Sequence, residues 1–189
     1  LKLLFDEALG FEGVCGLVIG TRPDCFKLET AEMLSRLSEK TYINVEFGLE
    51  STHNITLDFI KRGHTYEDSV LAMNLANSSG IRIGGHIILY LPGETEAMML
   101  ETARRISCLP IETLKLHQLQ ITKNTVMEKQ FRDKPELFYK ISADQYAEFA
   151  AIFLENLNPA IAIERFAGES KPSLIVSPNW KGVRSFDIT

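Results

Sequence analysis

The sequence predicts an α/β fold, a partial (βα) barrel with parallel strands, which is an incomplete TIM-like barrel. Strand and helix signals alternate in repeating units along the 189 residues. Short connections and right-handed crossovers then give a parallel sheet with helices outside it. A closed eight-unit barrel usually needs more than about 200 residues, so this length favours a partial barrel.

Strands are expected where short apolar runs end at turn residues. Ile87 to Pro92 is almost continuously apolar or aromatic, which suits a parallel strand covered on both faces. The segment Gly20–Asp24 closes the first strand. The expected strands cover residues 14–19, 42–49, 82–91, 113–121 and 160–166.

Helices are expected between these strands, with boundaries set by caps and breakers. Thr65 and Asp68 match a capping box, and Ser51 and Ser142 are expected N-caps. The expected helices cover residues 2–9, 29–40, 51–61, 65–78, 95–109 and 125–139, with another after Ser142. The inward positions of three of them are Tyr66, Val70, Met73 and Asn77; Met99, Ala103 and Ile106; and Tyr146, Phe149, Phe153 and Leu157.

Charge and cysteine content narrow the function classes. A net charge of −5 disfavours loose electrostatic binding to nucleic acid or to an anionic membrane. No apolar run has transmembrane length, and the first residues do not form a secretory signal. Cys15, Cys25 and Cys108 are widely spaced and form no CxxC or zinc pattern, so we expect reduced thiols in a cytoplasmic protein.

The most informative segment is the strand that contains His86 and ends at Pro92-Gly93. Acidic residues and a threonine follow at once, which suits the positive end of a helix dipole. Ligands bind just outside the carboxyl ends of strands in open or barrel-like parallel sheets. The sequence therefore predicts a site at this edge.

The order of the strand-end motifs resembles the radical S-adenosylmethionine (SAM) superfamily. Within it, the sequence is similar to the predicted iron–sulfur oxidoreductases related to oxygen-independent coproporphyrinogen oxidases and to the Elongator catalytic subunit. The motifs that carry the resemblance are Gly20–Asp24, Glu46–Ser51, Lys61–His64, His86–Thr95 and the tail from Ile163–Arg165 to Pro178–Trp180.

This resemblance implies a six-unit partial barrel that binds SAM and a [4Fe–4S] cluster. Three cysteines of a CxxxCxxC motif would hold the cluster, and cleavage of SAM would give a 5′-deoxyadenosyl radical. That motif and the Gly-Glu segment of the second unit are absent here. We therefore interpret residues 1–167 as the third to sixth units plus a C-terminal strand, and residues 168–189 as a loop-rich tail. Without cluster ligands, this fragment alone is not expected to perform the radical chemistry.

The resemblance also implies cofactor-binding residues. Glu50 would bind the ribose hydroxyls, Arg62 would clamp the methionine carboxylate, and His86 would face the ribose. Each residue also has a structural alternative to cofactor binding. Glu50 would interact with the helix dipole, and Arg62 would face solvent at a helix end.

Two further residues occupy family site positions with an altered side chain. Tyr90 replaces a glycine that is frequent in the family's loop, so its bulk is expected to change the approach of the backbone to adenine. Gly20 stands where relatives carry a glutamate, with Thr21 beside it as the remaining polar contact.

Two functions of other classes stay open. One is a non-catalytic binding or scaffold module, and the other is a metal-dependent lyase or hydrolase that uses His86 and His117, although no metal site is assigned. The substrate, a small molecule or a tRNA-like partner, is not identified by the sequence. No membrane partner is expected, whereas an exposed sheet edge predicts self-association.

Overall fold

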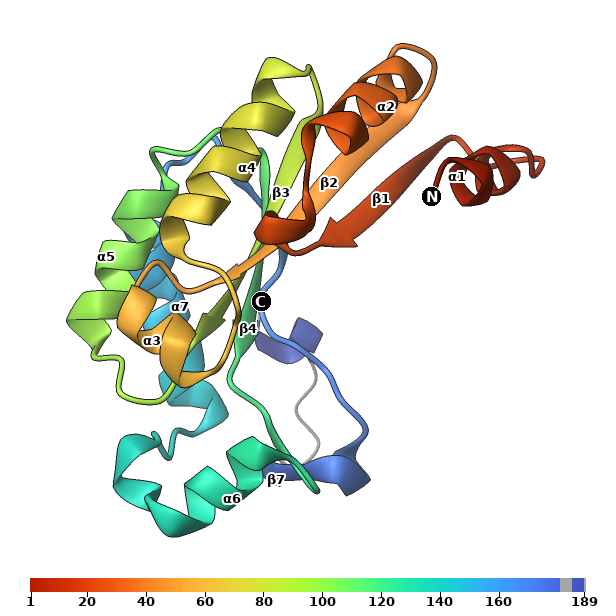
Figure 1. Cartoon of the computed structure of the whole chain (residues 1–189). Coiled ribbons are helices and arrows are strands. Elements are labelled where there is room, and N and C mark those ends of the chain that lie inside the picture. Colours follow the sequence, from red (N-terminus) through yellow and green to blue (C-terminus); the bar gives the residue numbers. More distant parts are fainter. Residues whose placement is uncertain (181–184, 189) are drawn as a thin grey trace.

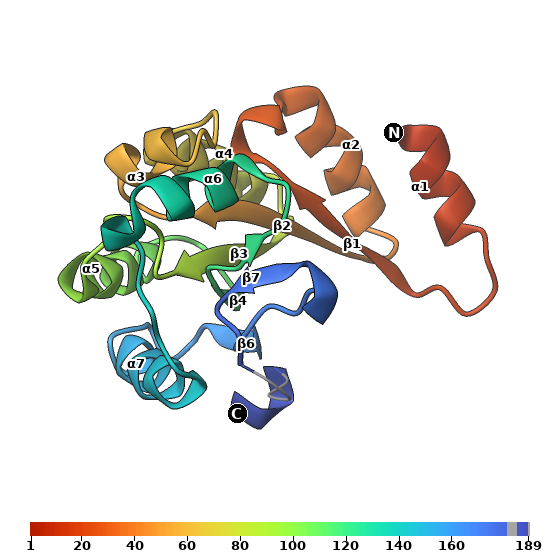
Figure 2. The ribbon, with the colours of Figure 1, turned by 90° about the horizontal axis from the view of Figure 1, so that it is seen from below.

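The computed structural model describes residues 1–180 and 185–188, and it confirms the partial barrel. Five strands pair in parallel in the order β1-β2-β3-β4-β6. They follow one another around an arc, with helices along its outer side (Figure 2). The strands are β1 (Gly16–Thr21), β2 (Tyr42–Glu50), β3 (Arg82–Leu89), β4 (Thr113–Gln118) and β6 (Ala162–Arg165).

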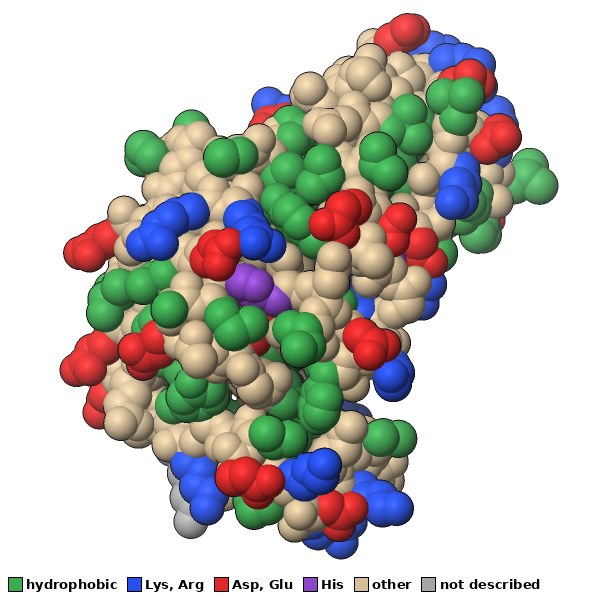
Figure 3. All heavy atoms as spheres, turned by 60° about the vertical axis from the view of Figure 1, so that its left-hand side comes forward, with side chains coloured by type: hydrophobic (Ala, Val, Ile, Leu, Met, Phe, Trp, Pro, Cys, Tyr) green, Lys and Arg blue, Asp and Glu red, His purple; other side chains and the backbone are tan. Residues whose placement is uncertain are grey.

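Helices cover one face of this sheet, and α2, α4, α5 and α7 form most of that layer (Figure 1). Helix α1 extends away from the sheet and contains no buried residue. The helices are α1 (Lys2–Leu9), α2 (Leu28–Ser38), α3 (Asn54–Phe59), α4 (Tyr66–Ser78), α5 (Glu96–Ile106), α6 (Val126–Asp133) and α7 (Ala143–Glu155). On the outer surface of this layer, acidic, basic and hydrophobic side chains are intermixed (Figure 3).

The two faces of the sheet differ in polarity because side chains alternate along each strand. The helix-covered face contributes the apolar core, including Val45 and Phe47 of β2 and Leu114 and Leu116 of β4. The concave face, which we call the lumen face, carries mainly polar residues and glycines, together with the apolar Val18 and Ile88. Its other residues include Gly20, Asn44, Glu46, Gly48, Gly84, His86, Thr113, Lys115 and His117. The run Ile87–Pro92 is largely buried, as expected for a covered strand, and on its lumen side Ile88 lies beside His117.

The helix caps confirm two of the predicted helix starts. Thr65 and Asp68 form the capping box of α4, and Ser142 caps α7 together with Gln145. The aromatic stripe of α7 is buried as expected. The buried face of α4 differs from the prediction, since its members are Ser69, Ala72, Met73 and Ala76.

Three boundaries differ from the sequence prediction. Helix α3 begins at Asn54 with His53 in the N-cap position. The Ser51 hydroxyl donates a hydrogen bond to Glu94 and accepts one from the His53 N–H rather than from the first turn of the helix. The strand expected over 113–121 ends at Gln118, and a separate strand β5 (Ile121–Thr122) follows. Strand β5 pairs antiparallel with β7 (Ile175–Ser177), so the tail is not loop throughout.

Candidate functional site

A charged network crosses the lumen face at Glu46. Lys115 Nζ donates to one oxygen of this carboxylate, and His86 Nε2 donates to the other at 2.7 Å. Lys115 also lies 3.2 Å from Glu164 of β6. Burial opposes ionisation, but the hydrogen bonds from Lys115 and His86 hold the pKa of Glu46 below its usual value. The carboxylate thus joins side chains of β2, β3 and β4, and Lys115 extends the network to Glu164 of β6.

Glycine makes room for this network. A Cβ atom at Gly84 would lie 2.9 Å from both Glu46 Cγ and Thr113 Oγ1, so a larger residue would displace them. Deeper in the lumen, both polar side-chain atoms of Asn44 are buried and have no hydrogen-bond partner among the described residues. The sequence therefore keeps polar groups on a surface that a parallel sheet normally fills with apolar residues.

At the carboxyl end of β2, Glu50 and Arg62 form an ion pair with 3.0 Å between Arg62 Nη2 and Glu50 Oε1. The same Nη2 donates to the Gly48 carbonyl oxygen at 3.0 Å. A Cβ atom at Gly48 would collide with the guanidinium and would lie 2.7 Å from Glu50 Oε1. The ion pair thus packs directly against the backbone of Gly48.

The backbone adopts left-handed conformations at Glu50 and on both sides of Arg62. Glu50 ends β2 with a φ of 66°, in the left-handed region. The turn after α3 that delivers Arg62 uses a φ of 55° at Lys61 and 82° at Gly63. Strained conformations of non-glycine residues cost about 1–3 kcal/mol each and cluster at functional sites.

The electrostatics of this pair suit a polar ligand. Burial raises the pKa of Glu50, although the charges of Arg62 and His86 oppose the shift. Arg62 Nε is buried and has no hydrogen-bond partner among the described residues. A ligand carboxylate could accept from Arg62, and ligand hydroxyls could donate to Glu50.

His86 and His117 lie side by side on β3 and β4. Their rings stack with 5.6 Å between centroids and 27° between planes. Burial, followed by the charge of His86, lowers the pKa of His117 to about 4. Among the described residues, no three His, Cys, Asp or Glu side chains gather so that they could hold a metal ion.

The structure brings Glu50, Arg62 and His86 together but places the other two predicted residues elsewhere. Tyr90 has a φ of 65°, and its ring is buried in the aromatic core beside residues of α7 rather than in the lumen. Thr21 pairs in register with Phe47, so its side chain belongs to the helix-covered face. Both positions remain predictions as cofactor contacts.

The sequence interpretation missed Glu46, Lys115 and Gly48 as site residues. A signal was available, because polar residues and glycine alternate along β2, and Thr113, Lys115 and His117 alternate along β4. Period-two polarity on two neighbouring strands indicates a polar face of a sheet.

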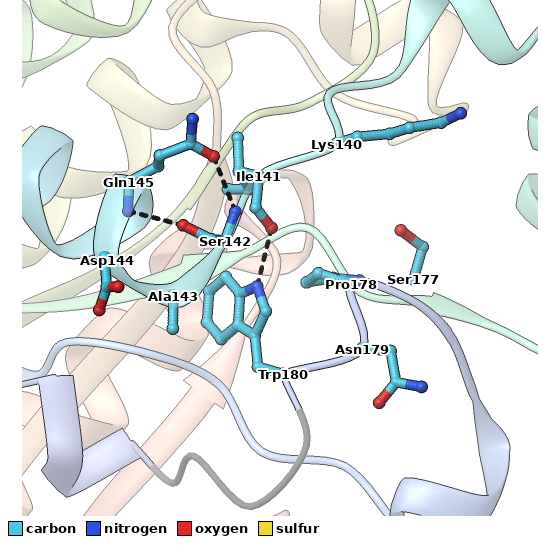
Figure 4. Close-up of a pocket in the computed structure, with 10 residues that line it drawn as sticks. All are labelled: Lys140, Ile141, Ser142, Ala143, Asp144, Gln145, Ser177, Pro178, Asn179 and Trp180. Atoms are coloured by element: carbon cyan, nitrogen blue, oxygen red, sulfur yellow. Dashed lines mark hydrogen bonds between the residues drawn. The ribbon is translucent and has the colours of Figure 1, made fainter.

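A pocket of about 620 Å³ lies outside the lumen, between the start of α7 and residues 177–180 (Figure 4). The Trp180 indole donates to the Ile141 carbonyl oxygen at 2.9 Å and packs against Tyr146. None of the lumen-face residues lines this pocket.

The cysteines do not fit an iron–sulfur cluster. Cys15 precedes β1 and Cys108 follows α5, which places both at the amino edge of the sheet, whereas Cys25 follows β1 at the carboxyl edge. A six-residue strand separates these edges by about 20 Å, so the three thiols cannot share one cluster. The Glu50–Arg62 pair, in contrast, has donors and acceptors that suit SAM.

A parallel partial barrel with a polar lumen defines a TIM-barrel-like α/β domain. The Radical SAM superfamily model matches residues 2–106, and the Radical_SAM C-terminal domain model matches residues 111–187. The chain belongs to the radical SAM superfamily.

Curated relatives are longer than this chain. Uncharacterized protein MJ0486 of Methanocaldococcus jannaschii is 38% identical over 182 residues, which cover 95% of this chain and 56% of the relative. The tRNA uridine(34) acetyltransferase of the same organism is 31% identical over 118 residues, which cover 54% of this chain and 21% of the enzyme. The chain therefore spans little more than half the length of the first of these relatives.

Two solved structures share the fold. The archaeal Elp3 of Methanocaldococcus infernus superposes with a TM-score of 0.75 at 21% identity, over 86% of this chain and 38% of that one. The radical SAM enzyme coproporphyrinogen III oxidase of Escherichia coli gives a TM-score of 0.61 at 17% identity, over 82% and 36%. No helix in the described part of the chain is long and apolar enough to cross a membrane.

Proposed function

We propose that this chain supplies the SAM-holding part of a radical SAM oxidoreductase whose [4Fe–4S] cluster is bound outside these 189 residues. Membership of the superfamily supports this function. When bound, the cluster would supply the electron for reductive cleavage of SAM, while the residues of this chain would hold the cosubstrate.

The observation that carries the proposal is the Glu50–Arg62 pair lying over Gly48 at the carboxyl end of β2. Arg62 can bind the methionine carboxylate through Nε, which otherwise has no partner among the described residues. Glu50 can accept hydrogen bonds from the ribose hydroxyls, and His86 lies close enough to act on its carboxyl group. The three residues would then contact the methionine carboxylate and the ribose of one cosubstrate.

Binding of SAM to the protein, produced at the full length that its gene encodes, tests these roles. Arg62→Ala is expected to weaken SAM binding about 10- to 100-fold, because a hydrogen bond to a charged group contributes about 1.5–3 kcal/mol. Arg104→Ala is the matched control, since Arg104 binds Asn156 on the helix layer. Equal affinities of the two variants would contradict the role of Arg62.

The pH dependence of SAM binding tests Glu50. Its carboxylate form accepts hydroxyl hydrogen bonds, and burial raises its pKa. Affinity is therefore expected to fall as the pH drops through this raised pKa, at a higher pH than for an ordinary glutamate. Glu50→Gln removes this dependence, and a wild-type affinity that stays constant down to pH 4 contradicts the role.

Anaerobic reconstitution of the full-length protein separates the enzyme from the other functions. Formation of 5′-deoxyadenosine from SAM supports the radical enzyme. A bound cluster without this product favours a non-catalytic binding or scaffold module. Stoichiometric zinc or manganese would favour a lyase or hydrolase at His86 and His117.

The substrate remains open between a small molecule and a tRNA-like molecule, and the comparisons include an enzyme named for tRNA uridine(34). We also propose a cytoplasmic location, because the three cysteines are free and exposed, as expected in a reducing compartment.

A further inference from the structure

His117 has no role in the function proposed above, yet it lies on the lumen face beside His86. Its Nε2 atom is screened from solvent and has no hydrogen-bond partner among the described residues. An unpaired buried polar atom costs about 1–3 kcal/mol, so its retention calls for an explanation such as a ligand.

The tail holds the other side of the His117 ring in place. Gly168 donates its N–H to Gln118 Oε1 at 2.8 Å and accepts from Gln118 Nε2 at 3.0 Å. Gln120 Nε2 donates to the same carbonyl oxygen. A Cβ atom at Gly168 would lie 2.5 Å from His117 Nδ1, so only glycine lets the backbone pass this close to the imidazole.

The surroundings keep His117 uncharged at neutral pH. Burial and the neighbouring His86 lower its pKa to about 4, and Arg165 and Lys115 act in the same direction while Glu46 opposes them. A neutral imidazole has one N–H donor and one lone pair. It suits the uncharged donor and acceptor edge of a ligand better than a carboxylate or a phosphate.

The spacing of the strands suits a nucleoside. Glu50 ends β2 and His117 lies on β4, with β3 between them. Their backbones are therefore two strand spacings apart, about 10 Å in total. A ribose at Glu50 would direct its base across β3 towards His117. The stacked rings of His86 and His117 add an aromatic surface against which a base can pack.

We propose that His117 is a nucleobase-binding residue that hydrogen-bonds the uncharged edge of a purine or pyrimidine held in the lumen. The inference rests on the proposed function, because the base belongs either to the adenosyl group of SAM or to the substrate.

Imidazole NMR of the ¹³C-histidine-labelled full-length protein tests this inference. The His117 signal, assigned by its loss in His117→Gln, is expected to keep the neutral form from pH 8 to pH 5. Gly168→Ala is expected to displace the ring from its buried position and raise the pKa of His117 towards 6.5. A wild-type His117 that titrates near pH 6.5 would overturn the proposal.

The ligand probes are SAM, and then uridine added to SAM-saturated protein. A His117 shift with SAM identifies the base as adenine, and a shift with uridine identifies a substrate base. For the probe that shifts the His117 signal, His117→Gln should lower the binding affinity about tenfold. His53→Gln, on the helix side of the sheet, should leave that affinity unchanged. If SAM binds and neither probe moves His117, this inference fails and the proposed function stands. If SAM does not bind at all, the proposed function fails with it.

Discussion

Gly48 shows how one missing side chain organises the candidate site. Its carbonyl oxygen accepts a hydrogen bond from Arg62, and the space above its Cα is filled by the guanidinium. The ion pair with Glu50 has partly buried side chains, so solvent screens it less than an exposed pair. A ligand therefore meets a preformed arrangement rather than two mobile side chains.

Gly48→Ala is expected to weaken SAM binding at least tenfold, because the new methyl group displaces the guanidinium from its position. Gly20→Ala is the matched control, since a Cβ atom at Gly20, on the lumen face of β1, meets nothing within 4 Å. Calorimetric titration with SAM measures both affinities, and circular dichroism checks the fold. Unchanged binding by Gly48→Ala would show that the pair does not hold the cosubstrate.

At the scale of elements, α7 shows that the helical repeat decides which of two neighbouring apolar residues is buried. Phe153 is fully buried at 0% exposure, whereas its neighbour Ile152 is 45% exposed. Phe153→Ala is expected to reduce the free energy of unfolding by about 3–5 kcal/mol through the cavity it creates. Ile152→Ala should change it by about 0.5 kcal/mol or less. Urea unfolding measures both, and equal losses would contradict the packing of α7.

Features with a local cause could be predicted from the sequence. The stripe of α7 follows from its helical spacing, and the capping box of α4 needs only Thr65 and Asp68. The grouping of Glu50, Arg62 and His86 was anticipated from the resemblance to the radical SAM superfamily, because Arg62 follows a short helix and strand-end position alone does not single it out.

Features that depend on distant contacts could not be predicted. The Ser51 hydroxyl donates a hydrogen bond to Glu94, 43 residues away, and α3 begins at Asn54 rather than directly after Ser51. Strands β5 and β7 are too short to show an alternating pattern, and they become strands by pairing with each other. The room that Gly48 leaves for Arg62 appears only when the strand and the turn after α3 are placed together.

At the scale of the molecule, the sheet has an open edge beside an apolar surface. Among the described residues β1 pairs with β2 alone, and helix α1 buries none of its side chains. Exposed strand edges and large apolar patches mark surfaces that bind another chain. We define the N-terminal patch as the exposed residues Leu3, Leu4, Phe11, Val14 and Val18.

We expect this chain to self-associate through the β1 edge and the N-terminal patch. Val18 is 58% exposed on β1, and Val18→Lys places a charge beside the edge, which natural sheets use to prevent pairing. Sedimentation velocity over a concentration series should show oligomers of the wild-type chain and a shift towards monomer for Val18→Lys. Leu71→Lys is the control, because Leu71 is 68% exposed on α4 in the helix layer. A wild-type chain that stays monomeric, or an equal effect of both variants, would contradict association through this edge.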